Sequence, residues 1–569
     1  MARSPLFRTL RRLMQRANVA RTGEAPVATS GPSRRDFFLG SIGAAALLPL
    51  VQACGDNTQP GAGGATVAIV GGGISGMTCA YMLSLAGVRA TVYEASMRIG
   101  GRMYTQREGL AGDQLVELGG ELVDSDHLVI PALARTLGLT LDDLLVDTAG
   151  LKQDIFYFNN AELSEQAIVT AFTPVAAKMA AAVMAGEALT PAGEAEFARI
   201  DAMSIPEWLE TEAGLPDTAV IRQLLEVAYL EEFGLEVTEQ SAWNLITLID
   251  YETPDPFRVF GDSDERYHLH QGNDAIPLAL ADRLGDQVVL DHALTKVTAQ
   301  GERVELVFAT MDGDVTVLAD HVVYALPFTK LREVDLTASN LSAEKLTIIN
   351  ELGYGTNAKL MLQFTDRHWE TAHASGGGVI TDVGELQATW ATSRGQAGAQ
   401  GILTNFVGGA RGVAIGEGSA ESQAAMVLPW IDTVLPGTQA KYIANSAIRQ
   451  HWPSAPFMKG SYACYKVGQF AFFGLEGVAE GGQHFCGEHT SEDYQGYMEG
   501  GAETGAMVAA EILDTLEIRL PQLLAGLLSQ LVERPRATYH GGFGDRMRVS
   551  EIRRRGSRRQ PARKVSVPG

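Results

Sequence analysis

Three glycines stand at the spacing of a phosphate-binding turn. Gly71, Gly73 and Gly76 follow a short apolar run and open a helical pattern. In a G-x-G-x-x-G turn the first glycine forms the bend and the second lets backbone amides approach a pyrophosphate. The third lets the helix pack close to the strand. Because the helix N-terminus also carries partial positive charge, the turn predicts a dinucleotide-binding site.

A carboxylate follows where the ribose of a dinucleotide would lie. The strand pattern over residues 90–93 ends in Glu94, eighteen residues after Gly76. An acid at this distance can accept hydrogen bonds from both ribose hydroxyls. Strand, glycine turn, helix, second strand and acid come in the expected order, so the segment predicts a Rossmann-like domain. The turn alone does not separate NAD from FAD.

The chain resembles the flavin-containing amine oxidase family, which includes monoamine, polyamine and L-amino-acid oxidases. The resemblance is carried by MRIGGRMYT (97–105), VELGGELVDS (116–125) and GEHTSEDYQGYMEGGAETG (487–505), and it spans about residues 65–515. It implies an α/β, two-domain flavoprotein. A Rossmann-like FAD-binding domain is built from discontinuous segments, and the substrate domain combines a mixed sheet with helices.

The resemblance implies that distant pieces of the chain converge on FAD. A helix start at Met498 would face the pyrimidine side of the flavin, where the reduced ring gathers negative charge. The strand LDHALTKV points to Leu294 beside the adenine ring, and Arg102 would reach the phosphates. The residues expected to bind the cofactor are Gly71, Gly73, Ile74, Ser75, Gly76, Glu94, Gly101, Arg102, Gly119, Gly120, Leu294, Trp452, Gly487, Glu488, Gly496, Tyr497 and Met498.

Three residues are expected to serve the reaction. The family keeps a lysine at the position of Lys359, where it holds a water against flavin N5, and its charge would assist oxygen reduction. Tyr462 and Tyr497 would face each other across the substrate as an aromatic sandwich, which attracts and orients an amine. His489 is interpreted as a hydrogen-bonded packing residue rather than a general base.

One short stretch offers an alternative to Tyr462. Tyr465 follows Cys464 in "ACY", which resembles a Cys-Tyr pair of monoamine oxidases whose cysteine bonds covalently to the flavin. Because Cys464 lies two residues late for that register, we expect FAD to be bound non-covalently. Tyr465 is retained as a candidate substrate residue.

The implied reaction is FAD-dependent oxidative deamination of a monoamine, diamine or polyamine to an imine and aldehyde, with oxygen reduced to hydrogen peroxide. L-Amino-acid oxidases usually place a carboxylate-binding arginine where this chain has Leu122. Glu121 and Asp124 stand beside it and could instead pair with a distant ammonium. L-Amino-acid oxidation is the first alternative, an FAD-binding lipoprotein that serves as electron relay or scaffold is the second, and an NAD-linked dehydrogenase is the third.

The binding segments divide the chain into two expected domains. The FAD-binding domain would comprise residues 65–125, 265–330 and 445–515. The substrate-binding domain would comprise residues 126–264 and 331–444.

Both ends of the chain have other patterns. Residues 1–54 join the twin arginine Arg34-Arg35 to an apolar run that is too short for a membrane span and ends at Cys54. This resembles a twin-arginine export signal, and VQAC resembles a lipoprotein cleavage site. We expect a periplasmic or cell-envelope protein, lipid-anchored if Cys54 is modified. Residues 55–64 read as a linker, and 516–569 as a C-terminal extension that is largely a disordered basic tail.

Net charge and cysteine spacing limit the kinds of partner that the chain is expected to bind. The net charge of −23 is concentrated between two basic ends, because residues 1–35 and 534–569 both carry more basic than acidic side chains. An acidic body disfavours nucleic acid and attracts small cations. None of the four cysteine spacings suits a zinc site, so no metal is expected. The expected partners are an amine and oxygen, with membrane contact only through the signal or lipid anchor. The oligomeric state stays open, with a homodimer as one option.

Overall fold

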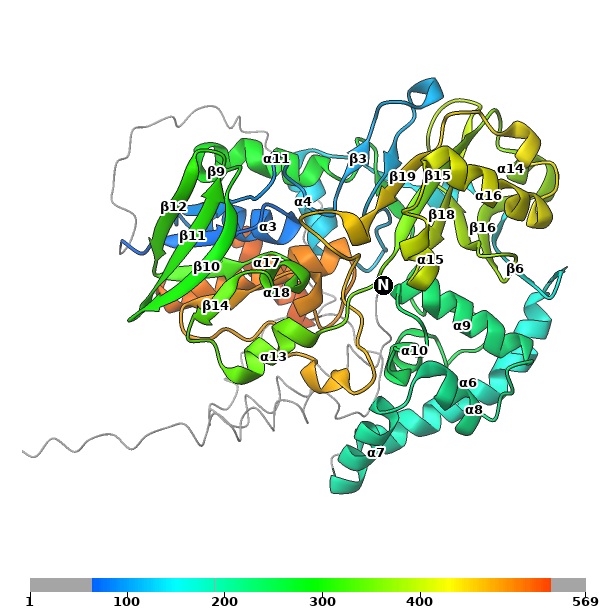
Figure 1. The fold of residues 1–569 in the computed structure, drawn as a ribbon, viewed down its shortest axis with the longest axis horizontal. Helices are drawn as coiled ribbons and strands as arrows, with labels where there is room; N and C mark the ends of the chain where they lie inside the picture. Colours follow the sequence, from blue (N-terminus) through cyan, green and yellow to red (C-terminus); the bar gives the residue numbers. More distant parts are fainter. Residues whose placement is uncertain (1–63, 189, 534–569) are drawn as a thin grey trace, which may run out of the picture.

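A computed structural model describes residues 64–188 and 190–533 of the chain. The predicted export signal, lipidation site and basic tail lie outside the described residues, as does nearly all of the predicted linker. Figure 1 shows two domains side by side: a cofactor domain with the N-terminal strands, and a domain with a second large sheet and most of the helices.

A five-stranded sheet holds the N-terminal glycine turn. Its order is β20-β13-β1-β2-β9, and every neighbouring pair is parallel. The strands are β1 (Val67–Val70), β2 (Ala90–Tyr93), β9 (Val288–Val289), β13 (His321–Tyr324) and β20 (Gln483–Phe485). β1 is buried along its whole length, as expected when elements cover both faces of a parallel sheet. Strands from three distant parts of the chain therefore build one sheet.

Two helices position the site end of this sheet. α3 (Ile74–Leu85) follows β1 directly, and α17 (Met498–Thr515) packs against it. The helices approach closely at Gly505, where a Cβ would lie 2.2 Å from the Ser75 carbonyl oxygen. Further elements of this half are α4 (Val129–Leu137), α11 (Ala275–Leu284), α12 (Phe328–Leu331), α13 (Ala343–Glu351), β10 (Ala293–Gln300), β11 (Arg303–Thr310), β12 (Gly313–Ala319) and β14 (Asp335–Ala338).

The second domain is built on a seven-stranded mixed sheet of order β19-β15-β18-β17-β16-β6-β7. β6 and β16 are parallel, and the other pairs are antiparallel. The strands are β6 (Lys152–Phe158), β7 (Ala161–Glu162), β15 (Ala358–Phe364), β16 (Ser375–Thr381), β17 (Gln387–Ala391), β18 (Gly401–Val407) and β19 (Ile448–His451). β15 has the sequence AKLMLQF and is buried along its whole length.

Helices surround this sheet. α9 (Val220–Phe233) packs against β6, β16, β17 and β18, while α16 (Ala420–Val434) packs against β15. The Ser204 hydroxyl caps α8 (Ile205–Thr211) by accepting a hydrogen bond from the Glu207 amide, and the two residues have the types and spacing of a capping box. The other elements are α5 (Leu144–Asp147), α6 (Glu165–Glu187), α7 (Pro191–Asp201), α8 (Ile205–Thr211), α10 (Ala242–Leu248), α14 (His368–His373), α15 (Gly409–Ala414) and the pairs β3 (Thr105–Gln106) with β4 (Val116–Glu117) and β5 (Leu141–Asp143) with β8 (Tyr267–Leu269).

Within the described chain, α6 is the one helix long and apolar enough to cross a membrane by length and composition. It nevertheless buries Phe172, Val175, Met179 and Val183 in the protein core. We therefore treat it as a core helix.

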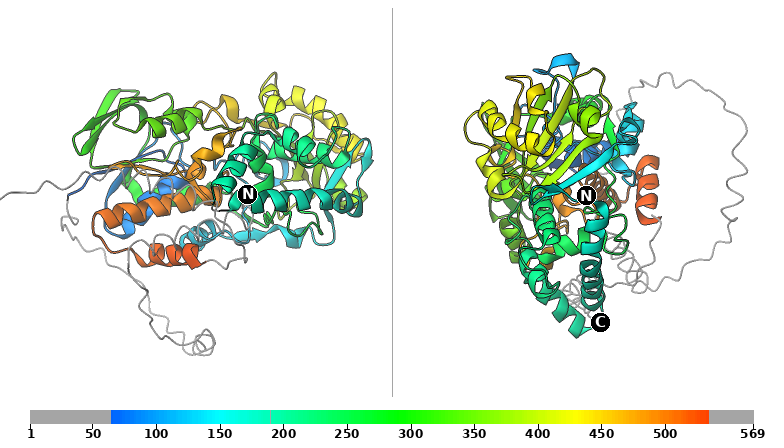
Figure 2. Two further views of the ribbon diagram at one scale, coloured as in Figure 1. Left: turned by 90° about the horizontal axis from the view of Figure 1, so that it is seen from below. Right: turned by 90° about the vertical axis from the view of Figure 1, so that its right-hand side faces the viewer.

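Strand pairing places two elements across the expected domain boundaries. β14, from the segment assigned to the substrate domain, pairs with β10, and β19, from a cofactor segment, pairs with β15. The extension expected from residue 516 is also not largely disordered at its start, because residues 522–533 form α18 (Gln522–Glu533). Leu524, Leu527 and Leu531 of α18 are buried, and Figure 2 shows it beside α17.

Candidate active site

A cavity of about 530 Å³ runs between the two domains. One end is lined by the glycine turn after β1 and by the start of α17. The other end is lined by the seven-stranded sheet and the end of α9. Of the predicted cofactor residues, all except Gly76 line this cavity.

The glycine turn has room for a ligand only in front of Gly73. A Cβ on Gly71 would lie 2.6 Å from the Ala325 carbonyl oxygen, and one on Gly76 would lie 2.1 Å from the Gly71 carbonyl oxygen. Both positions therefore require glycine for packing. A Cβ on Gly73 would meet no atom within 4 Å, so the space there is open. This is the arrangement that the predicted pyrophosphate needs.

Glu94 is fixed beside the turn by its own hydrogen bonds. Its carboxylate accepts from the Gly72 amide at 2.7 Å and from the Ser96 amide and hydroxyl at 2.9 and 2.7 Å. An ionised carboxylate offers about four acceptor positions, so one remains for a ligand hydroxyl. The residues present therefore fit the adenosine half of FAD.

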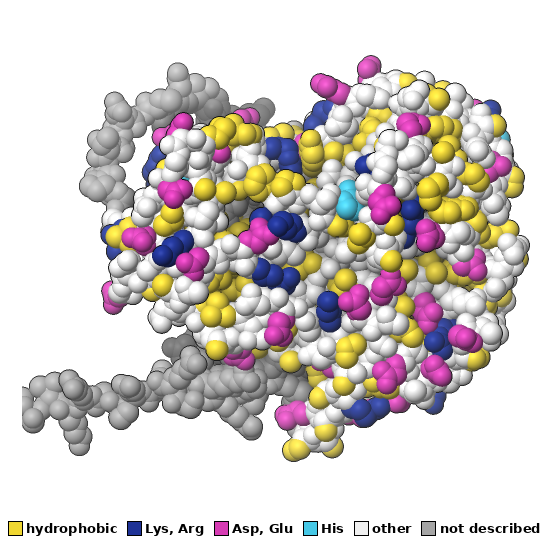
Figure 3. All heavy atoms as spheres, viewed as in Figure 1, with side chains coloured by type: hydrophobic (Ala, Val, Ile, Leu, Met, Phe, Trp, Pro, Cys, Tyr) yellow, Lys and Arg dark blue, Asp and Glu magenta, His cyan; other side chains and the backbone are white. Residues whose placement is uncertain are grey.

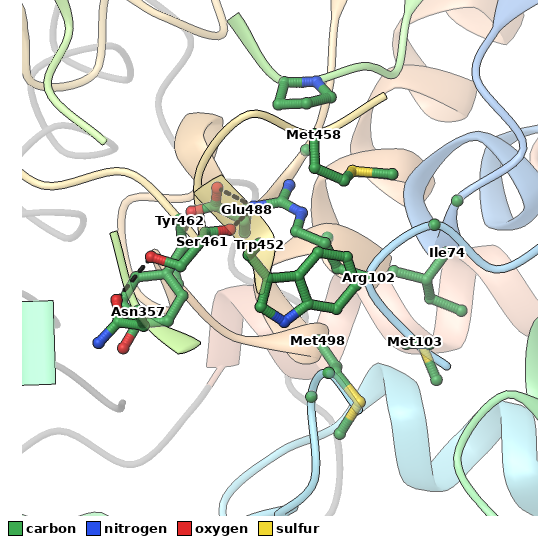
Figure 4. A pocket seen from close by; sticks show the side chains of 18 of the residues that line it. Ile74, Arg102, Met103, Asn357, Trp452, Met458, Ser461, Tyr462, Glu488 and Met498 are labelled. Carbon is green, nitrogen blue, oxygen red and sulfur yellow. Dashed lines mark hydrogen bonds and ion pairs between the residues drawn. The ribbon is translucent and has the colours of Figure 1, made fainter. Parts of the chain in front are cut away.

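Arg102 and Glu488, predicted as separate cofactor contacts, are joined to each other. Arg102 Nη1 donates to Glu488 Oε1 at 2.8 Å (Figure 4) and to the Ser461 carbonyl at 2.7 Å. Glu488 Oε2 accepts from the Gly496 amide. This network ties three cavity-lining segments together. Trp452 is held nearby, since its Nε1 donates to the Leu118 carbonyl at 3.0 Å.

Lys359 projects from β15 into the cavity wall and is only 4% exposed. Its Nζ donates to the carbonyl oxygens of Glu117 and Gly119 and to Glu121 Oε2, the last two at 2.8 Å. The ammonium also lies 5.2 Å from the centroid of the Trp390 ring. The lysine that was predicted to face the flavin is thus held rigidly by three acceptors.

Glu121 is the partner of this lysine, which sequence reasoning did not foresee. Its carboxylate also accepts from Trp390 Nε1 at 3.0 Å and from the Thr392 hydroxyl at 2.8 Å. Burial alone would raise the pKa of Glu121, but the charge of Lys359 and the hydrogen bonds from Lys359, Trp390 and Thr392 together outweigh burial and lower it. Three of the acceptor positions of Glu121 serve protein donors, and the residue lines the cavity, so its substrate role stays a prediction.

Both predicted tyrosines line the cavity. The Tyr462 hydroxyl donates to the Glu232 carbonyl, and its ring lies beside Gly496. The Tyr497 hydroxyl donates to Ser263 at 3.2 Å. The structure brings the two residues into one cavity, and their facing each other across a substrate stays a prediction.

Two other substrate candidates lie away from the cavity. Asp124 accepts from the Ser263 hydroxyl and the Glu265 amide, and Tyr465 is buried with its hydroxyl bonded to Glu476. Neither lines the cavity, nor does Cys464, which accepts from an asparagine amide. Cys464 is buried and does not line the cavity, in agreement with non-covalent FAD.

His489 differs from its prediction in one respect. It is buried against the Phe328 ring at 4.3 Å between centroids, which fits a packing role. Neither ring nitrogen, however, has a hydrogen-bond partner among residues 64–188 and 190–533. Burial, and then the charge of Arg102, holds its pKa well below the usual value, so the ring is neutral.

The far end of the cavity was not predicted. It is lined by four carboxylates and by apolar and aromatic side chains: Asp154, Glu231, Glu232, Glu265, Phe260, Val379, Ile380, Trp390 and Phe406. Most of these come from α9 and the seven-stranded sheet, where the family resemblance is weak or carries no motif. Adjacent glutamates at the end of a helical pattern were the one available signal.

A parallel sheet with a glycine turn, an acid in front of it and a second domain closing the cavity define a two-domain dinucleotide-binding oxidoreductase. The sequence profile described as flavin containing amine oxidoreductase matches residues 74–513. The chain therefore belongs to the flavin-containing amine oxidoreductase family, and it is an FAD-dependent enzyme.

Known proteins similar to this chain act on different substrates. It is 25% identical over 469 residues to an L-amino-acid oxidase of Siganus canaliculatus, covering 78% of this chain and 85% of the relative. It is 24% identical to a pseudooxynicotine dehydrogenase of Pseudomonas sp, covering 79% and 86%. Putrescine oxidase bound to putrescine has the same fold, with a TM-score of 0.67, 20% identity, and 79% and 99% coverage. Cyclohexylamine oxidase from Brevibacterium oxydans also has a TM-score of 0.67 and 20% identity, with 80% and 99% coverage.

Proposed function

We propose that this protein oxidises an amine rather than an amino acid. An amine, water and oxygen are converted through an imine to an aldehyde, ammonia and hydrogen peroxide. FAD, when bound, accepts the hydride equivalent from the carbon next to nitrogen and passes two electrons to oxygen.

The charge of the cavity carries this proposal. Three lysine and arginine side chains line the cavity in the described part of the chain, and each has a carboxylate partner: Arg102 with Glu488, Lys330 with Glu333, and Lys359 with Glu121. A substrate carboxylate would therefore be buried without a free cation, which is costly. An ammonium would instead enter a cavity whose far end carries four carboxylates.

The residues around the reacting end supply orientation and fixed charge. Tyr462 and Tyr497 are each held by a hydroxyl hydrogen bond, so their rings need no reordering when an amine binds. Lys359 places a positive charge in a dry wall, where it favours the build-up of negative charge during oxygen reduction. We expect Lys359→Met to slow reoxidation of the reduced enzyme by oxygen.

A panel assay tests the proposal. Peroxide release is measured from the purified FAD-loaded protein with monoamines, diamines, polyamines and L-amino acids at equal concentrations. We expect kcat/KM for the best amine to exceed that for the best amino acid at least tenfold. The reverse order would establish that the protein is an L-amino-acid oxidase. Several relatives of this chain carry that name. No turnover of any compound would favour a relay or scaffold.

We also propose export by the twin-arginine pathway with lipidation of Cys54. The supporting features are Arg34-Arg35 and the apolar run before Cys54. Fractionation of producing cells should place the protein in the envelope, and Cys54→Ala should release it from membranes. Wild-type protein that stays in the cytoplasm would contradict export.

A further inference from the structure

We propose that the end of α9 is an anionic subsite that binds a second cationic centre of the substrate. The preferred substrates would then be dications with a positive charge at each end of a chain, such as α,ω-diamines. This inference rests on the proposed function, because it names the class of amine.

The subsite consists of Glu231 and Glu232. They occupy the last turn of α9, are 4% and 5% exposed, and both line the cavity. No ion pair joins either carboxylate to a basic residue within the described chain. Glu232 Oε1 is fully buried, and no described residue forms a hydrogen bond with it. A buried carboxylate oxygen that lines a cavity and lacks a partner indicates a ligand that can supply one.

The position of Glu231 and Glu232 in α9 gives a second reason to expect a bound cation. The C-terminal end of a helix carries partial negative charge, so acidic side chains are unfavourable there. Two adjacent buried acids also repel each other, and burial raises the pKa of Glu232 to about 8. A ligand cation would offset both the partial negative charge of the helix end and the repulsion between the two carboxylates. Five described groups interact electrostatically with the pair, and none of these five is basic: Asp124, Asp154, Glu265, Tyr229 and Tyr462. The described cation Arg394 acts on Asp154 and Glu265.

Hydrogen bonds and ring packing connect the subsite to the end of the cavity where the amine would react. The Tyr462 hydroxyl donates to the main-chain oxygen of Glu232, and the ring of Tyr462 lies beside Gly496 at the start of the cofactor-facing segment. The Asn357 amide, next to Tyr462 in Figure 4, donates to the main-chain oxygen of Glu231. One tyrosine side chain thus separates the acidic end from the side where an amine would react. A dication of suitable length could satisfy both ends.

The test uses cations that the enzyme cannot oxidise to an imine. Guanidinium groups are planar and stay charged at all working pH values. Binding of α,ω-diguanidinoalkanes with four to eight methylenes is compared with binding of alkylguanidines of the same length. The readout is the absorption change of bound FAD in the complete protein at pH 9.

We expect the best dication to bind at least tenfold tighter than its matched monocation. That advantage should fall to less than threefold in Glu231→Gln/Glu232→Gln, while monocation binding changes less than threefold. The matched control is Glu239→Gln, which removes an exposed glutamate paired with Lys466 and should keep the full advantage. The advantage should also shrink from pH 9 to pH 6, since the carboxylates become protonated.

Equal binding of dications and monocations to the wild-type protein at every length would overturn the subsite. A tenfold advantage that survives in the double variant would do the same. The wild-type comparison stands even if the variants fail to fold. If no amine is oxidised but dications bind tighter, the proposed function fails and the subsite stands. If monoamines and diamines are oxidised equally and the probes show no preference, only the subsite fails.

Discussion

Removal of the Lys359 ammonium gives the most quantitative test of the site geometry. In Lys359→Met, Glu121 stays buried with Trp390 and Thr392 as its only two donors from the network described above. The unpaired carboxylate would then be forced to take up a proton. Protonating a carboxyl of ordinary pKa 4.5 at pH 7 costs about 3.4 kcal/mol, at about 1.36 kcal/mol per pKa unit. The two carbonyl groups that lose their donor add about 1 kcal/mol.

The penalty must depend on pH in one direction. In the variant the folded-state pKa of Glu121 lies above its unfolded value, so the cost is absent below about pH 4.5 and grows as the pH rises. We therefore expect a loss of unfolding free energy of about 3–5 kcal/mol at pH 7 and about 2 kcal/mol at pH 5. The double variant Lys359→Met/Glu121→Gln removes the charge and should recover most of the loss.

Urea unfolding followed by tryptophan fluorescence, with saturating FAD, measures these values. Lys441→Met is the matched control, because Lys441 and Asp366 form an exposed ion pair at 2.9 Å worth less than about 1 kcal/mol. A loss below about 1 kcal/mol at pH 7, an equal loss at both pH values, or a double variant as unstable as the single one would refute this reasoning.

Three further outcomes follow from single contacts. Glu94→Ala frees the amides of Gly72 and Ser96 and removes the expected ribose acceptor, so the FAD dissociation constant should rise about tenfold; unchanged affinity in a fluorescence titration would contradict this. Glu499 of α17 caps α4 by accepting hydrogen bonds from three backbone amides. Glu499→Ala should lower the free energy of unfolding, measured in urea, by about 3–5 kcal/mol. A loss under about 1 kcal/mol would show that water replaces the cap. Acid denaturation should release all FAD from wild type and from Cys464→Ser alike; flavin retained only by wild type would reveal a covalent bond.

Local patterns in the sequence sufficed for the cofactor end of the site. Gly71, Gly73 and Glu94 lie within one strand-turn-helix-strand unit, and their spacing alone fixes how they meet. Lys359 was found because the family keeps a lysine at that position. All three positions line the cavity, together with nearly every other predicted cofactor residue.

The features of the site that could not be predicted depend on contacts between residues that are far apart in the sequence. Glu121 meets Lys359 across 238 residues of chain, so its commitment to the lysine is invisible in the local sequence. Glu231 and Glu232 belong to a helix with no motif, and only the packing of α9 on the second sheet turns them toward the cavity. The net charge showed that the chain is acidic, but it did not show where the acidic residues gather in the structure. On the face shown in Figure 3, charges of both signs are interspersed.

Anaerobic mixing of the purified, FAD-loaded protein with an amine tests the central claim most directly. We predict that a diamine bleaches the visible absorption of the bound flavin, and that oxygen restores it with one hydrogen peroxide per flavin. Folded protein that binds no FAD, or bound flavin that no amine reduces, would contradict the account.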